Sequence, residues 1–233
     1  MIGSLRRDEG YDMPDWQIFD KPLAYEPTIS AMSAHVQAMQ KGEADEAVWV
    51  LSHEAVYTGG TSAEASDIIG MTDIPFVETG RGGQWTYHDE GMRIVYPMLD
   101  LNKRSQDVRL YVHCLEAWII DILDCFAIKG ERRDGLPGVW VRRTGSGELG
   151  EFDKIAALGV RVSKWVSAHG FAINLAPNLQ AFETIIPCGV TDAGTTSLAE
   201  LGHDIAQAEL DMAIKDCFSA HFGTNGQMAR KAS

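Results

Sequence analysis

Residues 185–190 read Ile-Ile-Pro-Cys-Gly-Val and place Cys188 between a proline and a glycine. Proline disfavours helix and removes a backbone donor, and glycine lets the chain turn with its amide groups exposed. A thiol in such a turn is open to a reactant that approaches from outside. The thiolate is the reactive form, and a free cysteine has a pKa of about 8.5, so a nucleophilic Cys188 needs an activating neighbour. A structural cysteine is the alternative.

The other three cysteines lie in predicted helices. Cys217 falls on the apolar stripe of one helix, and Cys114 and Cys125 lie eleven residues apart on the flank of another. We expect all three to be structural. The chain has no Cys-x-x-Cys pair and no cluster of cysteine with histidine, so we expect neither a disulfide scaffold nor a metal site.

Two kinds of side chain could activate the thiol of Cys188. An ammonium close to the sulfur would lower its pKa, and a neutral imidazole could take its proton. The candidates are the lysines of the middle third of the chain and the three histidines His53, His88 and His169. Spacing along the chain does not choose among them, because such partners meet in space.

A glycine-rich segment, TGRGGQWTYHDEG, occupies residues 79–91 between two predicted strands. Glycines at this density let a ligand approach the backbone closely. Arg81 and Gln84 offer hydrogen-bond donors, and the rings of Trp85 and Tyr87 could form an apolar wall. The segment is either a ligand-binding loop or a hairpin loop that binds nothing.

Nucleotide-binding motifs are not indicated. Residues 145–150, GSGELG, have the G-x-G-x-x-G spacing, but they join two predicted strands, and no acidic residue follows about 20 positions later. The chain also has no G-x-x-x-x-G-K-[ST] motif. We therefore expect neither a dinucleotide site nor a P-loop.

The charge of the chain bears on its partners. The formal net charge is −13, whereas binding to nucleic acid depends on lysines and arginines that neutralise phosphates, so we expect no nucleic-acid partner. Of the 20 basic side chains, 13 lie in residues 81–164. They could form an electropositive patch that attracts an acidic protein, and a solvated surface of mixed charge is the alternative.

The apolar residues form no membrane-length run. Arg6 and Arg7 are not followed by the apolar stretch of a secretory signal, and nowhere do 18 uninterrupted apolar residues occur. We expect a cytoplasmic protein that binds no membrane.

Apolar periodicity predicts three helices and six strands. The last three strands follow one another closely, which favours antiparallel pairing. Runs of strands with few helices are typical of an α+β fold with a mixed, largely antiparallel sheet. We expect a single domain over residues 1–222 and a disordered tail over 223–233. The predicted helices are 27–42, 105–126 and 208–222, and the predicted strands are 47–53, 74–80, 93–101, 139–143, 154–162 and 166–175.

Four stretches in this order resemble the lipoyl(octanoyl) transferases, which move an octanoyl group from acyl carrier protein to lysines of lipoyl domains. The stretches are LSHEAVYTGG, RGGQWTYH, KIAALGVRV followed by SAHGFAINL, and IIPCGV with TTSL beyond it. The resemblance implies the α/β architecture shared with biotin and lipoate ligases, in which helices flank a mixed sheet.

The resemblance also assigns roles to individual residues. It implies that Cys188 accepts the acyl group and that Lys154 activates Cys188, first as an ammonium that lowers the pKa of the thiol and then as a proton shuttle. His88 and His169 would shape the pocket. The implied acyl pocket comprises Arg81, Gly82, Gly83, Gln84, Trp85, Thr86, Tyr87, His88, Ala157, Leu158, Gly159, Gly170, Phe171 and Ala172.

The implied partners follow from this activity. The donor is octanoyl acyl carrier protein, and the acceptors are lipoyl domains of 2-oxoacid dehydrogenases and the glycine cleavage H protein. We expect a monomer that needs neither ATP nor another cofactor. Because acyl carrier proteins are acidic, the candidate docking residues are Arg132, Arg133, Arg142 and Arg143.

One stretch departs from the pattern of this family. His88 is followed by Asp89-Glu90-Gly91-Met92, where the family usually has Gly-Pro-Gly-Gln. Three other functions stay open at this point. They are an ATP-dependent lipoate or biotin ligase, a cysteine hydrolase that pairs Cys188 with a histidine, and a lipoyl-domain binder without catalysis.

Overall fold

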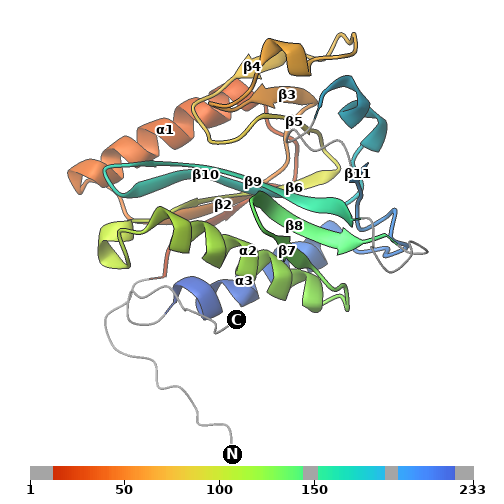
Figure 1. The fold of residues 1–233 in the computed structure, drawn as a ribbon. Coiled ribbons are helices and arrows are strands. Elements are labelled where there is room, and N and C mark those ends of the chain that lie inside the picture. The colour runs from red at the N-terminus through yellow and green to blue at the C-terminus, as the bar shows by residue number, and fades with distance from the viewer. Residues whose placement is uncertain (1–12, 144–151, 187–193, 224–233) are drawn as a thin grey trace, which may run out of the picture.

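The computed structural model describes residues 13–143, 152–186 and 194–223. Two sheets and three long helices form a layered fold (Figure 1). The large sheet has the order β1-β2-β6-β10-β9-β8-β7, and β11 pairs with β9. All neighbours are antiparallel except β1 with β2 and β11 with β9. Its strands are β1 (Asp15–Ile18), β2 (Ala47–Leu51), β6 (Met92–Met98), β7 (Glu131–Arg133), β8 (Leu136–Arg142), β9 (Phe152–Ser163), β10 (Val166–Asn174) and β11 (Gly194–Thr195).

A small sheet of order β4-β3-β5 lies with α1 on one face of the large sheet, and α2 and α3 cover the other face (Figure 1). Short 3-10 helices connect several elements. The small-sheet strands are β3 (Val56–Gly59), β4 (Phe76–Glu78) and β5 (Trp85–His88), the α-helices are α1 (Tyr25–Lys41), α2 (Val108–Asp124) and α3 (Gln207–Phe222), and the 3-10 helices are η1 (Ala65–Asp67), η2 (Leu101–Lys103) and η3 (Leu179–Thr184).

The helix ends have recognisable local causes. Helix α1 ends at Gly42, whose φ of 76° is in the left-handed region that glycine adopts at low cost. Helix α2 begins after Asp107, whose side chain accepts a hydrogen bond from the backbone N–H of Leu110. In α3, the carboxylate of Glu209 accepts from the N–H of Ala206. None of the helices in the described residues combines the length and the apolar character needed to span a bilayer.

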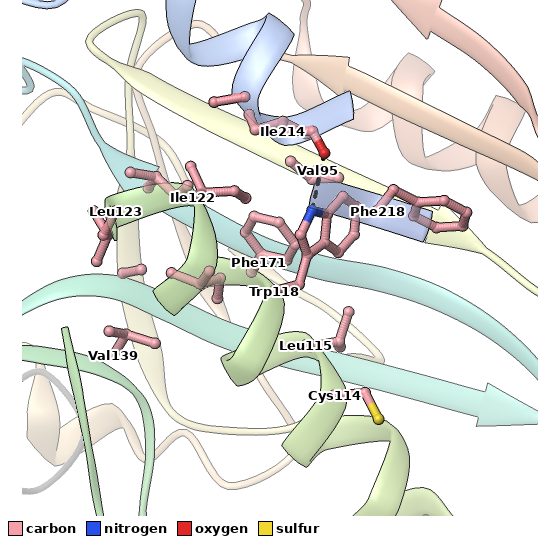
Figure 2. Close-up of a cluster of buried hydrophobic side chains, with 14 of the residues drawn as sticks. Val95, Cys114, Leu115, Trp118, Ile122, Leu123, Val139, Phe171, Ile214 and Phe218 are labelled. Carbon is pink, nitrogen blue, oxygen red and sulfur yellow. Dashed lines mark hydrogen bonds between the residues drawn. The ribbon is translucent and has the colours of Figure 1, made fainter. Parts of the chain in front are cut away.

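The large sheet separates two apolar cores. One lies under α2 and α3, where the indole N–H of Trp118 donates to the carbonyl of Ile214 over 2.9 Å and the ring packs edge-on against Phe171 and Phe218 (Figure 2). The other lies under α1 and the small sheet. Alternating residues of the central strands face opposite cores, so Phe171 packs toward α2 and Ala172 toward α1.

The three predicted helices and the antiparallel pairing of the last three predicted strands are confirmed. Strands β1, β3, β5, β7 and β11 were not predicted. Strand β5 includes part of the glycine-rich segment, because Trp85–His88 pair with β3 instead of forming an open loop. Among the cysteines, Cys114 is buried and Cys217 packs partly buried against the core. The expectation is wrong for Cys125, which is exposed where α2 ends.

A buried ion pair joins the large sheet to α3. In this pair, Nε and Nη2 of Arg93 on β6 donate to the two carboxylate oxygens of Asp211 over 2.6 and 2.8 Å, and the side chains are 0% and 8% exposed. Because the arginine is fully buried, its charge has no solvent to replace a lost partner.

We predict that Asp211→Asn lowers the free energy of unfolding by roughly 3 kcal/mol, since it leaves the buried Arg93 charge without a counter-charge. Urea unfolding followed by circular dichroism measures the change. The control is Lys129→Gln, which removes an ion pair whose lysine side chain is 86% exposed and should cost less than about 1 kcal/mol. Equal midpoints for Asp211→Asn and the control would contradict a stabilising role.

Candidate active site

A cavity lies between the large sheet and the layer formed by α1 and the small sheet. The space in it that no atom fills, its open mouth included, is about 560 Å³. The lining residues are Tyr25, Arg81, Gly83, Gln84, Trp85, Thr86, His88, Ile94, Tyr96, Ala157, Leu158, Gly159, His169, Gly170, Phe171 and Ala172.

The structure brings together most of the pocket residues named from the sequence. All of them line this cavity except Gly82 and Tyr87. Their role in binding a substrate stays a prediction. Sequence reasoning did not assign Tyr25, Ile94 and Tyr96 to the pocket. The last two alternate on β6 and face the same side, so strand periodicity could have found them, whereas nothing local marks Tyr25.

Close backbone contact holds the glycine-rich segment against β9. The N–H of Gly82 donates to the carbonyl of Val160 over 3.0 Å, and a Cβ on Gly159 would lie only 2.8 Å from the carbonyl oxygen of Gly82. A side chain at position 159 would therefore push the segment away. Gly83, with a φ of 90°, lets the chain turn there.

Arg81 holds the segment in shape. Its Nη2 donates to the carbonyl and the hydroxyl of Thr58 and to the carbonyl of Gln84, and its Nη1 donates to the carbonyl of Gly82. The residue is only 8% exposed. The guanidinium thus binds carbonyls of β3 and of its own segment, which fixes the wall of the cavity.

Three histidines and two tyrosines form a buried group at the cavity. His53 contacts the carbonyl of Leu23 through Nδ1 and the hydroxyl of Tyr96 through Nε2, each over 2.9 Å. Its ring centroid is 6.1 Å from that of His88, which stacks at 6.4 Å against Tyr25. The hydroxyl and imidazole groups make this part of the wall polar.

This polar wall is uncharged at neutral pH. Burial lowers the pKa of His53 and of His169 to about 4, and burial lowers the pKa of His88 well below its usual value, with nearby His53 and Arg81 adding to that shift. His169 also has a φ of 58°, an unusual conformation for a non-glycine residue within a strand. Neutral, buried histidines fit a role in shaping the cavity.

Lys154 lies on β9, the strand that also contributes Ala157 and Gly159 to the cavity. It is 8% exposed, and its Nζ donates to the carbonyl of Pro137 over 3.2 Å and lies 4.6 Å from the ring centroid of Trp140. Lys154 itself does not line the cavity among the described residues.

Cys188 lies outside the described residues, as does the GSGELG stretch at 145–150. The described chain on either side of Cys188 is anchored near the site. The N–H of Ile186 donates to the carbonyl of Asp67 over 2.8 Å. At the other end, β11 pairs with β9, and the N–H of Thr196 donates to the carbonyl of Lys154 over 3.0 Å. Contact between the side chains of Cys188 and Lys154 stays a prediction.

Comparison with solved structures defines the fold class. A bipartite lipoate protein ligase from Thermoplasma acidophilum has a TM-score of 0.70 at 12% identity and covers 95% of this chain and 87% of its own. Lipoate-protein ligase A bound with ATP has a TM-score of 0.63 at 14% identity, with 94% and 88% covered. The predicted fold, a mixed, largely antiparallel sheet of the biotin and lipoate ligase kind, is confirmed.

Sequence comparison defines the family within this fold. Residues 24–219 match the lipoyl protein ligase A/B catalytic domain. An octanoyltransferase of Parvibaculum lavamentivorans is 46% identical over 96% of this chain and 99% of its own length, and one of Dinoroseobacter shibae is 48% identical over 90% and 97%. The chain therefore belongs to the octanoyltransferase family, and the predicted enzyme class, an acyltransferase of protein lipoylation, is confirmed.

The buried histidines predict a specific acid sensitivity. His53 has a folded-state pKa of about 4, below its unfolded value near 6.5. Between these two values the imidazole is protonated in the unfolded chain and neutral in the folded chain. The stability from neutral His53 is complete above pH 6.5 and is lost as the pH falls toward 4. We predict that between pH 7.5 and pH 5, His53→Gln loses roughly 1–2 kcal/mol less stability than the wild type.

Urea unfolding at the two pH values measures this difference. Each protein serves as its own reference at pH 7.5, where the imidazole is neutral in both states. An identical loss for the wild type and His53→Gln would contradict the depressed pKa.

Proposed function

We propose that this octanoyltransferase takes its acyl group from octanoyl acyl carrier protein and passes it to the lysine of a lipoyl domain through a thioester on Cys188. Lys154 carries the proposal, since it is buried on the strand that also lines the cavity. The match to octanoyltransferases over nearly the whole chain supports the same activity.

The cavity would hold the acyl chain. Trp85, Ile94 and Ala172, whose side chains belong to the core under α1 and the small sheet, supply apolar surface, and each methylene buried there contributes about 0.8 kcal/mol of binding. The binding free energy of an eight-carbon chain is therefore several kcal/mol more favourable than that of a short acyl group. Methylenes that contact the polar wall of histidines and tyrosines gain less.

In the first half-reaction, the Cys188 thiolate attacks the carbonyl carbon of the octanoyl thioester. The tetrahedral oxyanion collapses, the bond to the carrier sulfur breaks, and the leaving thiolate takes a proton from the Lys154 ammonium. One thioester replaces another, so no ATP is consumed. Lys154 ends this step as a neutral amine.

In the second half-reaction, the neutral amine of the acceptor lysine attacks the thioester carbonyl. Neutral Lys154 takes the proton from the attacking nitrogen, the amide forms, and Cys188 leaves as the thiolate. The ammonium–thiolate pair is restored, and the thioester supplies the free energy of amide formation. An acceptor that arrives as an ammonium releases its extra proton to solvent.

We predict that mixing the protein with octanoyl acyl carrier protein adds the mass of one octanoyl group to the intact chain. The adduct is absent in Cys188→Ala, forms at least a hundredfold more slowly in Lys154→Ala because the general acid is lost, and disappears when a lipoyl domain is added. Intact-mass spectrometry measures all three.

The competing functions give different results in the same assay. An ATP-dependent ligase needs ATP and keeps its activity in Cys188→Ser. A cysteine hydrolase releases free octanoate and is indifferent to Lys154→Ala. A binder without catalysis forms no adduct, and any of these outcomes would overturn the proposal.

Docking of the acidic carrier protein is best supported at the outer end of β7 and β8. Among the predicted arginines, Arg132 pairs with Glu116 and Arg143 with Asp153, and their side chains are 33% and 43% exposed. Arg133 lies over the rings of Trp140 and Phe152. Arg142 and nearby Lys129 both pair with Glu131, but their side chains stay 58% and 86% exposed.

We predict that the double variant Lys129→Glu/Arg142→Glu raises the KM for octanoyl acyl carrier protein by about tenfold and weakens its salt dependence, since rim charges act on encounter with the partner. Its rate with free octanoyl-pantetheine should stay unchanged. The single variants Lys129→Glu and Arg142→Glu are each compared with Arg109→Glu, which makes the same change of charge at an exposed position on α2. A KM no higher than that of the control would place docking elsewhere.

A further inference from the structure

The ammonium of Lys154 lies against an aromatic ring, that of Trp140. Trp140 on β8 lies directly opposite Lys154 on β9, and the lysine Nζ is 4.6 Å from the centroid of the indole ring. Directly opposite residues of antiparallel strands project from the same face of the sheet. The ring is therefore a cross-strand neighbour of the ammonium.

A β-bulge creates this pairing. Val139 is opposite Ala156, but the next residue, Trp140, is opposite Lys154, so β9 carries one extra residue, Ile155, at this point. Ile155 and Ala156 both face the core under α2 and α3. In a regular strand Lys154 would face that core with Ala156, and the bulge turns it to the opposite face.

Trp140 is itself held in place. It is 1% exposed, and its indole N–H donates to the carbonyl of Leu136 over 3.2 Å. The ammonium also donates to the carbonyl of Pro137, two residues before Val139. The β8 strand thus supplies a ring face and a carbonyl oxygen to the same nitrogen.

The charged groups around this contact are few among the described residues. The carboxylate of Glu116 on α2 accepts from the N–H of Gly138 and pairs with Arg132, and the charge of Lys154 helps to lower its pKa. The guanidinium of Arg133 lies 5.6 Å from the Trp140 centroid. Asp153, next to Lys154, pairs with Arg143.

An aromatic ring suits a lysine that must exist in two protonation states. A ring face attracts an ammonium through its quadrupole and has no site that accepts a proton. A carboxylate in the same place would hold the ammonium more strongly, but its negative charge would oppose formation of a nearby thiolate. The neutral amine can stay against the same ring once the proton has left.

We propose that Trp140 is a positioning residue that holds Nζ of Lys154 in place through both half-reactions. The inference rests on the proposed function, because it gives a purpose to fixing that nitrogen. Trp140 would touch neither substrate. It acts on the reaction only through the position of the lysine.

The test compares Trp140→Leu, which removes the ring, with Trp140→Phe, which keeps a smaller one. The readout is the pH dependence of alkylation of Cys188 by iodoacetamide, followed by mass spectrometry of the Cys188 peptide. We expect the pH of half-maximal rate to rise by about one unit in Trp140→Leu, which makes alkylation about tenfold slower at a pH well below both midpoints, and to rise by less in Trp140→Phe. Trp16→Leu, a change on distant β1, should match the wild type.

The kinetics give a second readout. We expect Trp140→Leu to lower kcat for acylation about tenfold and to leave KM for octanoyl acyl carrier protein unchanged, because only the proton-transfer group is displaced. A folded Trp140→Leu with the wild-type pH profile and kcat would overturn the proposal. If Trp140→Leu does not fold, a wild-type profile in Trp140→Phe overturns it instead.

Lys154→Ala separates this inference from the proposed function. If Lys154→Ala shifts the alkylation profile and the Trp140 variants do not, the positioning role fails and the Cys188–Lys154 chemistry stands. If Lys154→Ala leaves the profile and the acylation rate unchanged, both fail together.

Discussion

The pairing of β9 with its neighbours is the constraint on which the site depends. On one side β9 pairs with β8, on the other with β10 and β11, and its own residues include Lys154 and part of the cavity wall. The bulge at Ile155 determines from which face of the sheet the side chain of Lys154 projects. Because Gly159 has no side chain, the glycine-rich segment can pack against β9 there. A strand that is hydrogen-bonded on both sides has little freedom to slip, so a register error would displace the lysine and the cavity wall together.

The cavity combines two kinds of wall for one purpose. Its apolar side chains favour an acyl chain, and its imidazole and hydroxyl groups are buried in neutral form, as the lowered pKa values of His53 and His169 indicate. A charged imidazole in this position would be costly to bury and would be repelled by the nearby guanidinium of Arg81. Neutral polar groups avoid both costs and still hold one another in place, as His53 does with Tyr96.

The sequence was informative where a pattern is local and regular. The apolar stripe of α2 and the alternation of β10 follow from side-chain periodicity, so both were predictable. Strand β5 was not, because Trp85–His88 become a strand only through pairing with distant β3. The bulge at Ile155 depends on the register of β8, and the use of Arg81 as an anchor depends on carbonyls that the fold brings to it. Motif resemblance found the cavity wall but could not tell lining residues from supporting ones.

The departure from the family pattern after His88 has a structural explanation that leaves the cavity intact. One carboxylate oxygen of Asp89 accepts from the N–H of Gly91, and the other accepts from the N–H of Asn178, so the turn between β5 and β6 is tied to the chain that follows β10. Gly91 also lies so close to Ala176 that a Cβ would meet its carbonyl oxygen at 2.2 Å. Both oxygens of the Asp89 carboxylate thus accept from backbone N–H groups. In this chain the Asp89 carboxylate closes the turn between β5 and β6, where the family usually has Gly-Pro-Gly-Gln. The histidines and tyrosines of the polar wall keep their places beside the cavity that would hold the acyl chain.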